Sequence, residues 1–286
     1  MMTGSTVLSL YDDTPCDVLQ RRTGSPQFVA VDRCTSTMDL VHQLAADGAA
    51  HGTAVVAEEQ GAGRGRTGKS WVSERDAGVW VSVLLRHSSA NAPATGVLSL
   101  RTGLELANAL DVFSDRSIQL KWPNDLLVGG LKLAGILTEA RWRGDQLEWI
   151  VVGVGVNVLK TAERTPIAML MPGTRRSDVL ISTIQCVLRA AGHAGDLTVA
   201  ELARFATRDF AVGREVQAPI AGTVLGVTER GGVVISWYGS WSELASMCSR
   251  PQIKHPSPRS SPARVAAMFW SARLSACCAP PITPVI

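Results

Sequence analysis

Apolar and polar residues follow two different rhythms along this chain. Between residues 28 and 32 they alternate, which predicts a strand that is buried on one face. From Ser36 onward apolar residues recur at helical spacing, and Thr35 or Ser36 is a natural N-cap. The longest helical pattern covers residues 95–113, and we expect it to form the main buried helix.

Strand patterns outnumber helical ones over the rest of this region. Further strands are predicted at residues 53–58, 79–86, 118–122, 125–128, 132–139 and 146–158, and further helices at 177–191 and 198–209. Runs of strands with helices between them are typical of an α+β fold, in which helices flank a mixed sheet. Residues 1–27 are polar and rich in turn signals, and we interpret them as a mobile leader.

The regular pattern weakens after residue 210 and then breaks. Strand signals at 215–217 and 223–225 indicate the opening of a small barrel within residues 211–236. After Ile235 the alternation is lost, and seven of the 14 prolines lie in residues 237–286. Because proline cannot donate to a strand ladder, we do not expect this barrel to close. We interpret the last 50 residues as a disordered tail or as a frame-shifted reading of the coding sequence.

The net charge of +3 comes from this last segment, which holds five basic residues and one acidic residue. The remainder of the chain is close to neutral, so no general basic surface for nucleic acid is indicated. The six cysteines show no metal-ligand spacing and suit reduced thiols, which predicts a cytoplasmic protein. The sequence shows neither a signal peptide nor an apolar run long enough to span a membrane.

A glycine-rich loop at residues 58–71 has three possible meanings. The spacing of residues 63–70 fits both the P-loop pattern and the dinucleotide-binding fingerprint, but both require a helix directly after the loop. The residues after Ser70 predict a charged turn and another strand, so the helix N-terminus that would bind phosphate is missing. We therefore favour a flexible basic loop in which Arg64 and Arg66 offer guanidinium groups to a carboxylate or a phosphate.

Three more motifs follow this loop in order. They are Lys-Trp-Pro-Asn-Asp at residues 121–125, Lys-Leu-Ala-Gly-Ile-Leu at 132–137 and Gly-Val-Gly-Val-Asn at 153–157. Together with the Gly-Arg-Gly-Arg loop and an upstream Ser-Thr pair, they resemble the biotin–protein ligase family over roughly residues 28–210. The resemblance implies a class II synthetase-like mixed sheet followed by an SH3-like barrel, which is incomplete here. Residues 1–27 are too short for a helix-turn-helix domain, so we expect a monofunctional form without a DNA-binding domain.

The resemblance implies a ligase that uses ATP in two steps. The carboxylate of biotin attacks the α-phosphate of ATP, giving biotinyl-5′-AMP and pyrophosphate. A specific lysine of a biotin carboxyl carrier domain, part of an acyl-CoA carboxylase, then takes the biotinyl group. ATP, Mg²⁺ and biotin are the expected small molecules. Because both reactants of the first step are anions, the site must supply positive charge and placement rather than a nucleophile.

The resemblance also assigns roles to individual residues. Lys132 and Arg64 are the expected catalytic residues. The expected biotin-binding residues are Ser36, Thr37, Met38, Gln60, Gly63, Arg64, Gly65, Arg66, Lys132, Gly135 and Gly155. The expected ATP-binding residues are Arg66, Lys121, Trp122, Asn124, Lys132 and Asn157. Asp125 is the expected Mg²⁺ ligand. Met38 stands where the family most often has asparagine.

Each motif also has a purely structural interpretation. Lys132 could be an edge-strand lysine facing water, residues 121–125 a local β-turn, and Ser36 a simple helix cap. Three other functions stay open: a lipoate–protein ligase, which shares the fold and the adenylation chemistry, a P-loop-type nucleotide-binding protein, and a biotin-binding protein without ligase activity. The broken C-terminal pattern keeps the last of these open.

Overall fold

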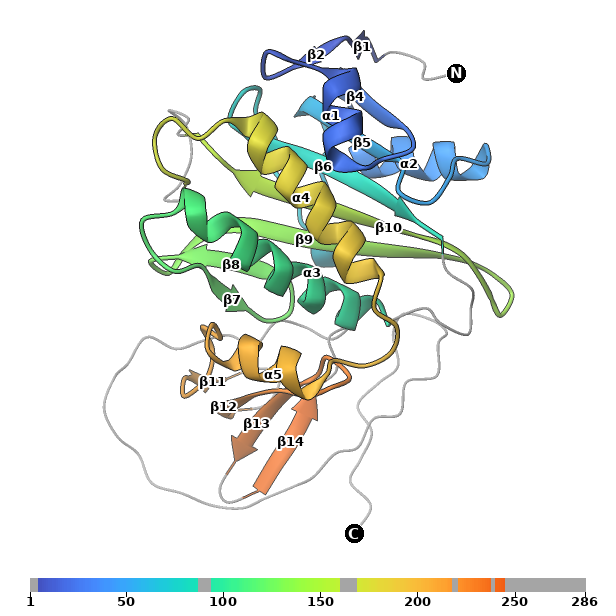
Figure 1. Ribbon diagram of the computed structural model, residues 1–286. Coiled ribbons are helices and arrows are strands. Elements are labelled where there is room, and N and C mark those ends of the chain that lie inside the picture. Colours follow the sequence, from blue (N-terminus) through green and yellow to red (C-terminus); the bar gives the residue numbers. More distant parts are fainter. Residues whose placement is uncertain (1–4, 87–93, 160–168, 218–220, 238–239, 245–286) are drawn as a thin grey trace.

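The computed structural model of the chain describes residues 5–86, 94–159, 169–217, 221–237 and 240–244 (Figure 1). Its centre is a mixed sheet with the strand order β1-β4-β5-β6-β10-β9-β8-β7. These strands are β1 (Val7–Leu8), β4 (Phe28–Cys34), β5 (Ala54–Gln60), β6 (Gly78–Leu85), β7 (Gln119–Lys121), β8 (Asp125–Val128), β9 (Leu131–Arg143) and β10 (Gln146–Asn157). Among the described strands of this sheet, β4 and β5 form the one parallel pair. A helix connects them, as a parallel crossover requires.

Helices cover both faces of the sheet (Figure 1). On one face lie α1 (Cys16–Thr23), α3 (Thr95–Leu110) and α4 (Arg176–Ala191), and on the other lies α2 (Thr37–Ala46). Alternation along β5 follows this division, because Ala54 and Val56 join the core beneath α3 and α4, whereas Val55 packs beneath α2. With both faces covered, β6 is buried along its whole length. The predicted α+β fold with a mixed, helix-flanked sheet is confirmed.

The predicted helices and strands of this region lie close to their expected positions. The apolar pattern at 95–113 forms α3, followed by a short 3-10 helix at Asp111–Phe113. The patterns at 177–191 and 198–209 form α4 and α5 (Val199–Ala206). In the part of the chain described here, no helix is both long and apolar enough to cross a lipid bilayer.

The expectation of a mobile leader is wrong for residues 5–27. Here β1 pairs with β4, β2 (Leu10–Tyr11) pairs with β3 (Thr14–Pro15), and α1 packs beside α4. The side chains of Tyr11 and Leu19 are fully buried in the main core.

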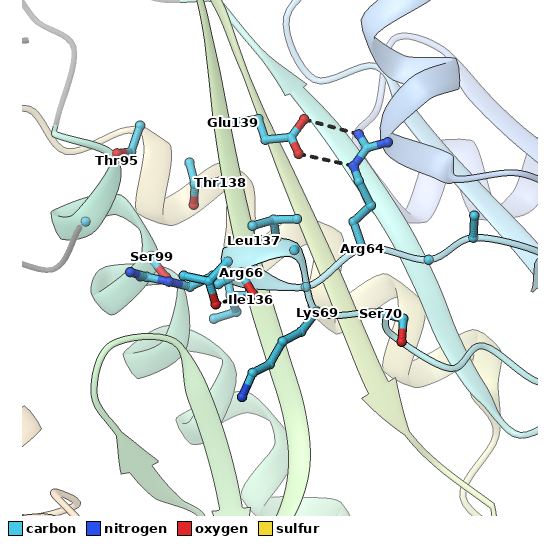
Figure 2. Close-up of a pocket in the computed structure, with 16 residues that line it drawn as sticks. Arg64, Arg66, Lys69, Ser70, Thr95, Ser99, Ile136, Leu137, Thr138 and Glu139 are labelled. Carbon is cyan, nitrogen blue, oxygen red and sulfur yellow. Dashed lines mark hydrogen bonds and ion pairs between the residues drawn. The ribbon is translucent and has the colours of Figure 1, made fainter. Parts of the chain in front are cut away.

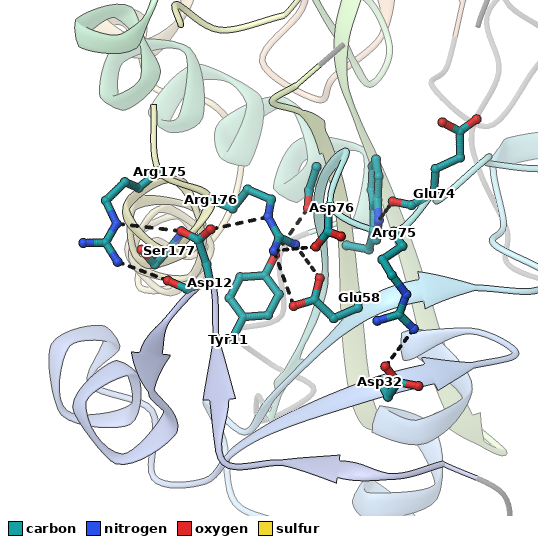
Figure 3. A network of polar contacts seen from close by, with 12 residues as sticks. Tyr11, Asp12, Asp32, Glu58, Glu74, Arg75, Asp76, Arg175, Arg176 and Ser177 are labelled. Atoms are coloured by element: carbon teal, nitrogen blue, oxygen red, sulfur yellow. Dashed lines mark hydrogen bonds and ion pairs between the residues drawn. The ribbon is translucent and has the colours of Figure 1, made fainter. Parts of the chain in front are cut away.

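Polar residues that look like a leader in the sequence are held by a buried arginine of α4. Figure 3 shows Arg176 between the carboxylates of Asp12, Glu58 and Asp76. The backbone N–H of Ser177 also donates to Asp12, at 2.9 Å. The anchor is an ion-pair network between residues far apart in the sequence, and a local polar pattern cannot reveal it.

A second, smaller sheet follows α5. Its antiparallel strands lie in the order β11 (Glu215–Val216), β12 (Gly222–Val227), β13 (Val233–Trp237) and β14 (Ser240–Leu244). The strand β14 falls inside residues 237–286, so the expectation that strand structure stops near Ile235 is wrong by one strand. Residues 245–286 lie outside the described part of the chain, and the disordered or frame-shifted tail stays a prediction for them.

Candidate functional site

Motifs that are far apart in the sequence meet at one cavity of about 120 Å³ on the large sheet. The N-terminus of α2, the glycine-rich loop, β9 and β10 supply its walls. Eleven of the predicted site residues line it: Ser36, Thr37, Met38, Gln60, Arg64, Gly65, Arg66, Asn124, Lys132, Gly135 and Gly155. As expected from the sequence, the glycine-rich loop joins two strands, and only a three-residue 3-10 helix at Arg66–Gly68 lies between Gln60 and β6. This arrangement excludes the P-loop interpretation, which needs a helix after the loop.

One end of the cavity is a buried polar network at the start of α2. The hydroxyl of Ser36 caps the helix by accepting from the N–H of Met38. Both the N–H and the hydroxyl of Thr37 contact Oε1 of Gln60, at 2.8 and 3.2 Å. The Thr37 hydroxyl also lies 2.8 Å from that of Ser82, a residue without a sequence motif. Amide and hydroxyl groups therefore converge at this end, and the cap role of Ser36 is confirmed.

The middle of the cavity is a narrow slot above Gly135 and Gly155. Gly135 and Gly155 are direct partners in the pairing of β9 with β10. The indole of Trp71 lies against both, since a Cβ atom on Gly155 would lie 2.5 Å from the ring and one on Gly135 would lie 2.8 Å from it. The two positions must be glycine for this close approach. Sequence analysis missed Trp71, although a tryptophan in a polar loop was a possible signal.

The other end of the cavity carries the positive charge of Lys132. Its ammonium lies 2.8 Å from Oδ1 of the buried Asp125 and 4.7 Å from the ring centroid of Trp71. The strand β9 lies between β10 and β8, so Lys132 is not the edge-strand lysine of the structural alternative. An ion pair and a cation–π contact both hold the ammonium at the slot.

Asp125 fits a metal ligand poorly. Its carboxylate is occupied by Lys132, and within the described residues no three His, Cys, Asp or Glu side chains gather as a metal cluster. A Mg²⁺ ion that arrives with a nucleotide is held largely by phosphate oxygens and water. We assign no metal ligand in this chain.

Of the remaining predicted nucleotide residues, Asn124 lines this cavity, whereas Lys121, Trp122 and Asn157 are not among its lining residues. Asn124 donates to the carbonyl of Ile136 at 2.7 Å and Asn157 donates to that of Lys132 at 3.1 Å, so both brace β9. Lys121 lies near the ring of Phe210, 6.0 Å from its centroid. The indole of Trp122 is buried in the main core and donates to the carbonyl of Gly231 in the small sheet. Trp122 is not among the residues that line this cavity, and its expected contact with the nucleotide stays a prediction.

A larger cavity of about 580 Å³ adjoins the first across the glycine-rich loop. Residues 62–70, including the predicted Gly63, form one wall, and the first turn of α3 with residues 136–139 of β9 forms the other. Figure 2 shows Arg66 directed toward Ser99, whereas Arg64 turns away toward Glu139. The cavity thus combines Arg66 and Lys69 with hydroxyl groups, a set suited to phosphate.

Arg64 bridges two carboxylates that sequence analysis did not single out. Its guanidinium pairs with Asp39 of α2 and, at 3.2 and 3.3 Å, with both oxygens of Glu139. The pKa of Glu139 is lowered, first by a hydrogen bond from His42 and then by Arg64. Neither carboxylate belongs to a motif, so only the fold brings them to the loop.

Comparisons with known proteins agree with the resemblance seen in the sequence. A model of the biotin/lipoate A/B protein ligase family matches residues 30–157. The bifunctional ligase/repressor BirA of Bacillus spizizenii is 35% identical over 135 residues, which are 47% of this chain and 41% of that protein. The biotin–[acetyl-CoA-carboxylase] ligase of Mycobacterium tuberculosis is 36% identical over 132 residues, which are 45% of this chain and 48% of that protein. The chain therefore spans less than half the length of these relatives.

Solved structures share the fold. The biotin protein ligase of Aquifex aeolicus in complex with biotin and ATP aligns with a TM-score of 0.64 at 23% identity, over 81% of this chain and all of that one. Biotin acetyl coenzyme A carboxylase synthetase of Helicobacter pylori, with biotinylated ATP bound, aligns with a TM-score of 0.56 at 21% identity, over 76% of this chain and 99% of that one. The expected synthetase-like sheet followed by a small β-domain is thus confirmed as a fold. Residues 30–157, which carry all the motifs, form a domain of the biotin/lipoate A/B protein ligase family.

Proposed function

We propose that this chain is an ATP-dependent ligase that activates biotin as biotinyl-5′-AMP and transfers it to a specific lysine of a biotin carboxyl carrier domain. One observation carries the proposal, namely the order of chemical groups along the smaller cavity. A polar network at Thr37 and Gln60 is followed by the glycine and tryptophan slot, and this slot is followed by the ammonium of Lys132. Similar proteins of Mycobacterium tuberculosis and Paracoccus denitrificans carry the name biotin–[acetyl-CoA-carboxylase] ligase, and this supports the proposal.

Biotin presents its groups in the same order. Its ureido ring both donates and accepts hydrogen bonds, which suits the amide and hydroxyl groups at the start of α2. Its sulfur ring and aliphatic chain are apolar, and they suit packing against the indole of Trp71, which itself lies on Gly135 and Gly155. Its terminal carboxylate would then face Lys132. The proposed orientation therefore pairs each part of the ligand with a chemically complementary wall.

The first chemical step forms a bond between a carboxylate oxygen of biotin and the α-phosphorus of ATP, and pyrophosphate leaves. Lys132 lowers the repulsion between the two anions, and Asp125 holds its ammonium in place. Arg66 and Lys69 line the adjoining cavity and would contact the phosphates. In the second step an uncharged lysine amine of the carrier attacks the carbonyl carbon. An amide forms, AMP leaves, and the amine gives up a proton.

Biotin rather than lipoate is the proposed substrate, although the matching family model covers both kinds of ligase. The relative from Mycobacterium tuberculosis acts on biotin according to its name, and the narrow slot suits a rigid bicyclic head. We propose a carrier domain of an acyl-CoA carboxylase as the acceptor and the cytoplasm as the location. ATP would bring Mg²⁺, for which we assign no protein ligand.

A pyrophosphate-release assay tests the activation step. Mixing the protein with ATP and biotin should release pyrophosphate, while lipoate in place of biotin should release none. Biotin binding without pyrophosphate release would support a binding protein instead. Release with lipoate alone would move the assignment to lipoate ligation.

A further inference from the structure

Arg64 connects the glycine-rich loop to both rigid walls of the site. Its Nε and Nη2 atoms form a fork on the carboxylate of Glu139 in β9, and its Nη1 atom pairs with Asp39 in the first turn of α2. A guanidinium engaged on both sides in this way is fixed in position. This side chain therefore points toward Glu139 and Asp39, as Figure 2 shows for Glu139.

Within the loop, backbone hydrogen bonds make a small hairpin. The backbone N–H of Trp71 donates to the carbonyl of Gly63 at 2.8 Å, and the backbone N–H of Gly65 donates to the carbonyl of Lys69 at 2.6 Å. The base of the loop is tied to the chain before α2, where Ala62 donates to Thr35 at 2.9 Å. Arg64 lies just beyond this base, so its ion pairs set the angle at which the hairpin lies over the slot.

Two further side chains orient Glu139. The indole N–H of Trp149 donates to Nδ1 of His42 at 2.9 Å, so this nitrogen must be the acceptor and the imidazole proton lies on Nε2. That Nε2 lies 3.0 Å from Glu139 and donates to it. The chain of donors runs from Trp149 through His42 to Glu139, and it aims the carboxylate at the guanidinium.

We propose that Asp39 and Glu139 are positioning residues that hold the glycine-rich loop closed over the site through Arg64. His42 and Trp149 keep Glu139 in register. This inference rests on the proposed function for its consequence, which is retention of the adenylate. The ion pairs of Arg64 with Asp39 and Glu139, which we call the latch, can be tested independently of that function. In this proposal Arg64 holds the glycine-rich loop closed, whereas Arg66 and Lys132 face the reactants.

The exposure of the latch explains why it can open. The side chains of Arg64 and Glu139 are 35% and 33% exposed, and that of Asp39 is 49% exposed. Ion pairs at such exposure are weak one by one. Two pairs sharing one arginine hold the loop but still release it when substrates enter. Removing both should raise the open fraction about tenfold.

The test uses the neutral isosteres Asp39→Asn and Glu139→Gln, alone and combined, in the full chain. Glu148→Gln is the matched control, because Glu148 pairs with arginines on the same β9–β10 hairpin but lies outside both cavities. Trypsin cleavage after Arg64 and Arg66 without ligand measures loop opening. Release of labelled biotinyl-adenylate in a chase measures retention.

The double variant should be cleaved in the loop and should release adenylate about tenfold faster than the parent, with the control unchanged. Unchanged cleavage in the double variant overturns the latch. Asp39→Asn alone decides the question if Glu139→Gln impairs folding, because Asp39 is exposed, and it too must speed loop cleavage. If the parent protein forms no adenylate, the proposed function fails, and the cleavage comparison still tests the latch.

Discussion

The role that we propose for Lys132 depends on the groups that hold its ammonium, not on the strand on which it lies. Asp125 and the face of Trp71 fix the charge at the end of the slot, where an anion would otherwise lack a partner. Lys132→Ala should therefore reduce biotin-dependent pyrophosphate release at least a hundredfold. The fold should survive, because the side chain is partly exposed. Arg21→Ala, on the exposed face of α1, is the control. Near-normal release from Lys132→Ala would contradict the assignment.

Gly155 should tolerate no side chain. Its Cβ would lie 2.5 Å from Trp71, so alanine must displace the indole from the slot. Gly155→Ala should weaken biotin affinity at least tenfold in calorimetry. Gly61→Ala is a suitable control, since its Cβ would meet no atom nearer than 3.9 Å. Equal biotin affinity in the two variants would mean that the slot is not where biotin binds.

Residues within motifs were predictable from the sequence, while their supporting residues were not. Lys132, Gly135 and Gly155 lie where the motifs place them, on two adjacent strands. Asp39 and Glu139 are ordinary surface acids until folding brings both to Arg64. Trp122 shows the converse, since a motif residue is used for packing against the small sheet. Contacts over long sequence separations decide these cases, and periodicity carries no information about them.

At the scale of helices and strands, the link between α3 and α5 is a buried ion pair. Arg101 is almost fully buried and pairs with Glu201, which also belongs to the capping box of α5. Burial alone would raise the pKa of Glu201, but hydrogen bonds from Arg101 and Thr198 outweigh it and lower the pKa to about 2 from its usual 4.5. Ionised Glu201 therefore stabilises the fold fully above about pH 4.5, and this contribution is lost as the pH falls toward 2.

Glu201→Gln should lower the free energy of unfolding by roughly 2–3 kcal/mol at pH 7. The difference from the parent should shrink as the pH falls from 4.5 toward 2. Urea denaturation at pH 7 and pH 3 measures this. Asp17→Asn, which removes an exposed pair with Arg21, should change little. A Glu201→Gln difference that is as large at pH 3 as at pH 7 would show that the ion pair is not the cause.

Most helices and strands were predictable because their core faces are regular. The long apolar runs became β6 and α3, both covered by other elements. The N-terminal strands and α1 escaped prediction because they bury only a few apolar side chains, such as Tyr11 and Leu19, without a long periodic face, and because Asp12 is held by a distant ion pair with Arg176. The strand β14 escaped prediction because the alternation of apolar and polar residues is lost after Ile235. The pairing of strands nevertheless continues, since β14 pairs with β13.

At the scale of the whole molecule, the small sheet is attached to the part of the chain that carries the large sheet through hydrogen bonds of the backbone and of a side chain. The backbone N–H of Leu197 donates to the carbonyl of Glu229 at 2.8 Å, and the indole N–H of Trp122 donates to the carbonyl of Gly231 at 3.0 Å. Residues 245–286 follow this sheet with a proline-rich composition. We predict that removing them leaves the melting temperature unchanged. A drop of several degrees would show that they belong to the fold.

Translating the coding sequence in the two other frames tests the frame-shift hypothesis, which fails if neither frame restores a strand pattern.

The central claim is most directly tested by biotin transfer to a carrier. Purified protein, ATP and labelled biotin should add one biotinyl group to a biotin carboxyl carrier domain, as measured by intact mass. Replacing the acceptor lysine of the carrier with arginine should abolish the mass gain, as should omitting ATP or using the Lys132→Ala variant. Lipoate should add nothing. Two results would contradict the account. In the first, this protein leaves the carrier unmodified although a known biotin ligase modifies the same carrier. In the second, the carrier gains lipoate instead of biotin.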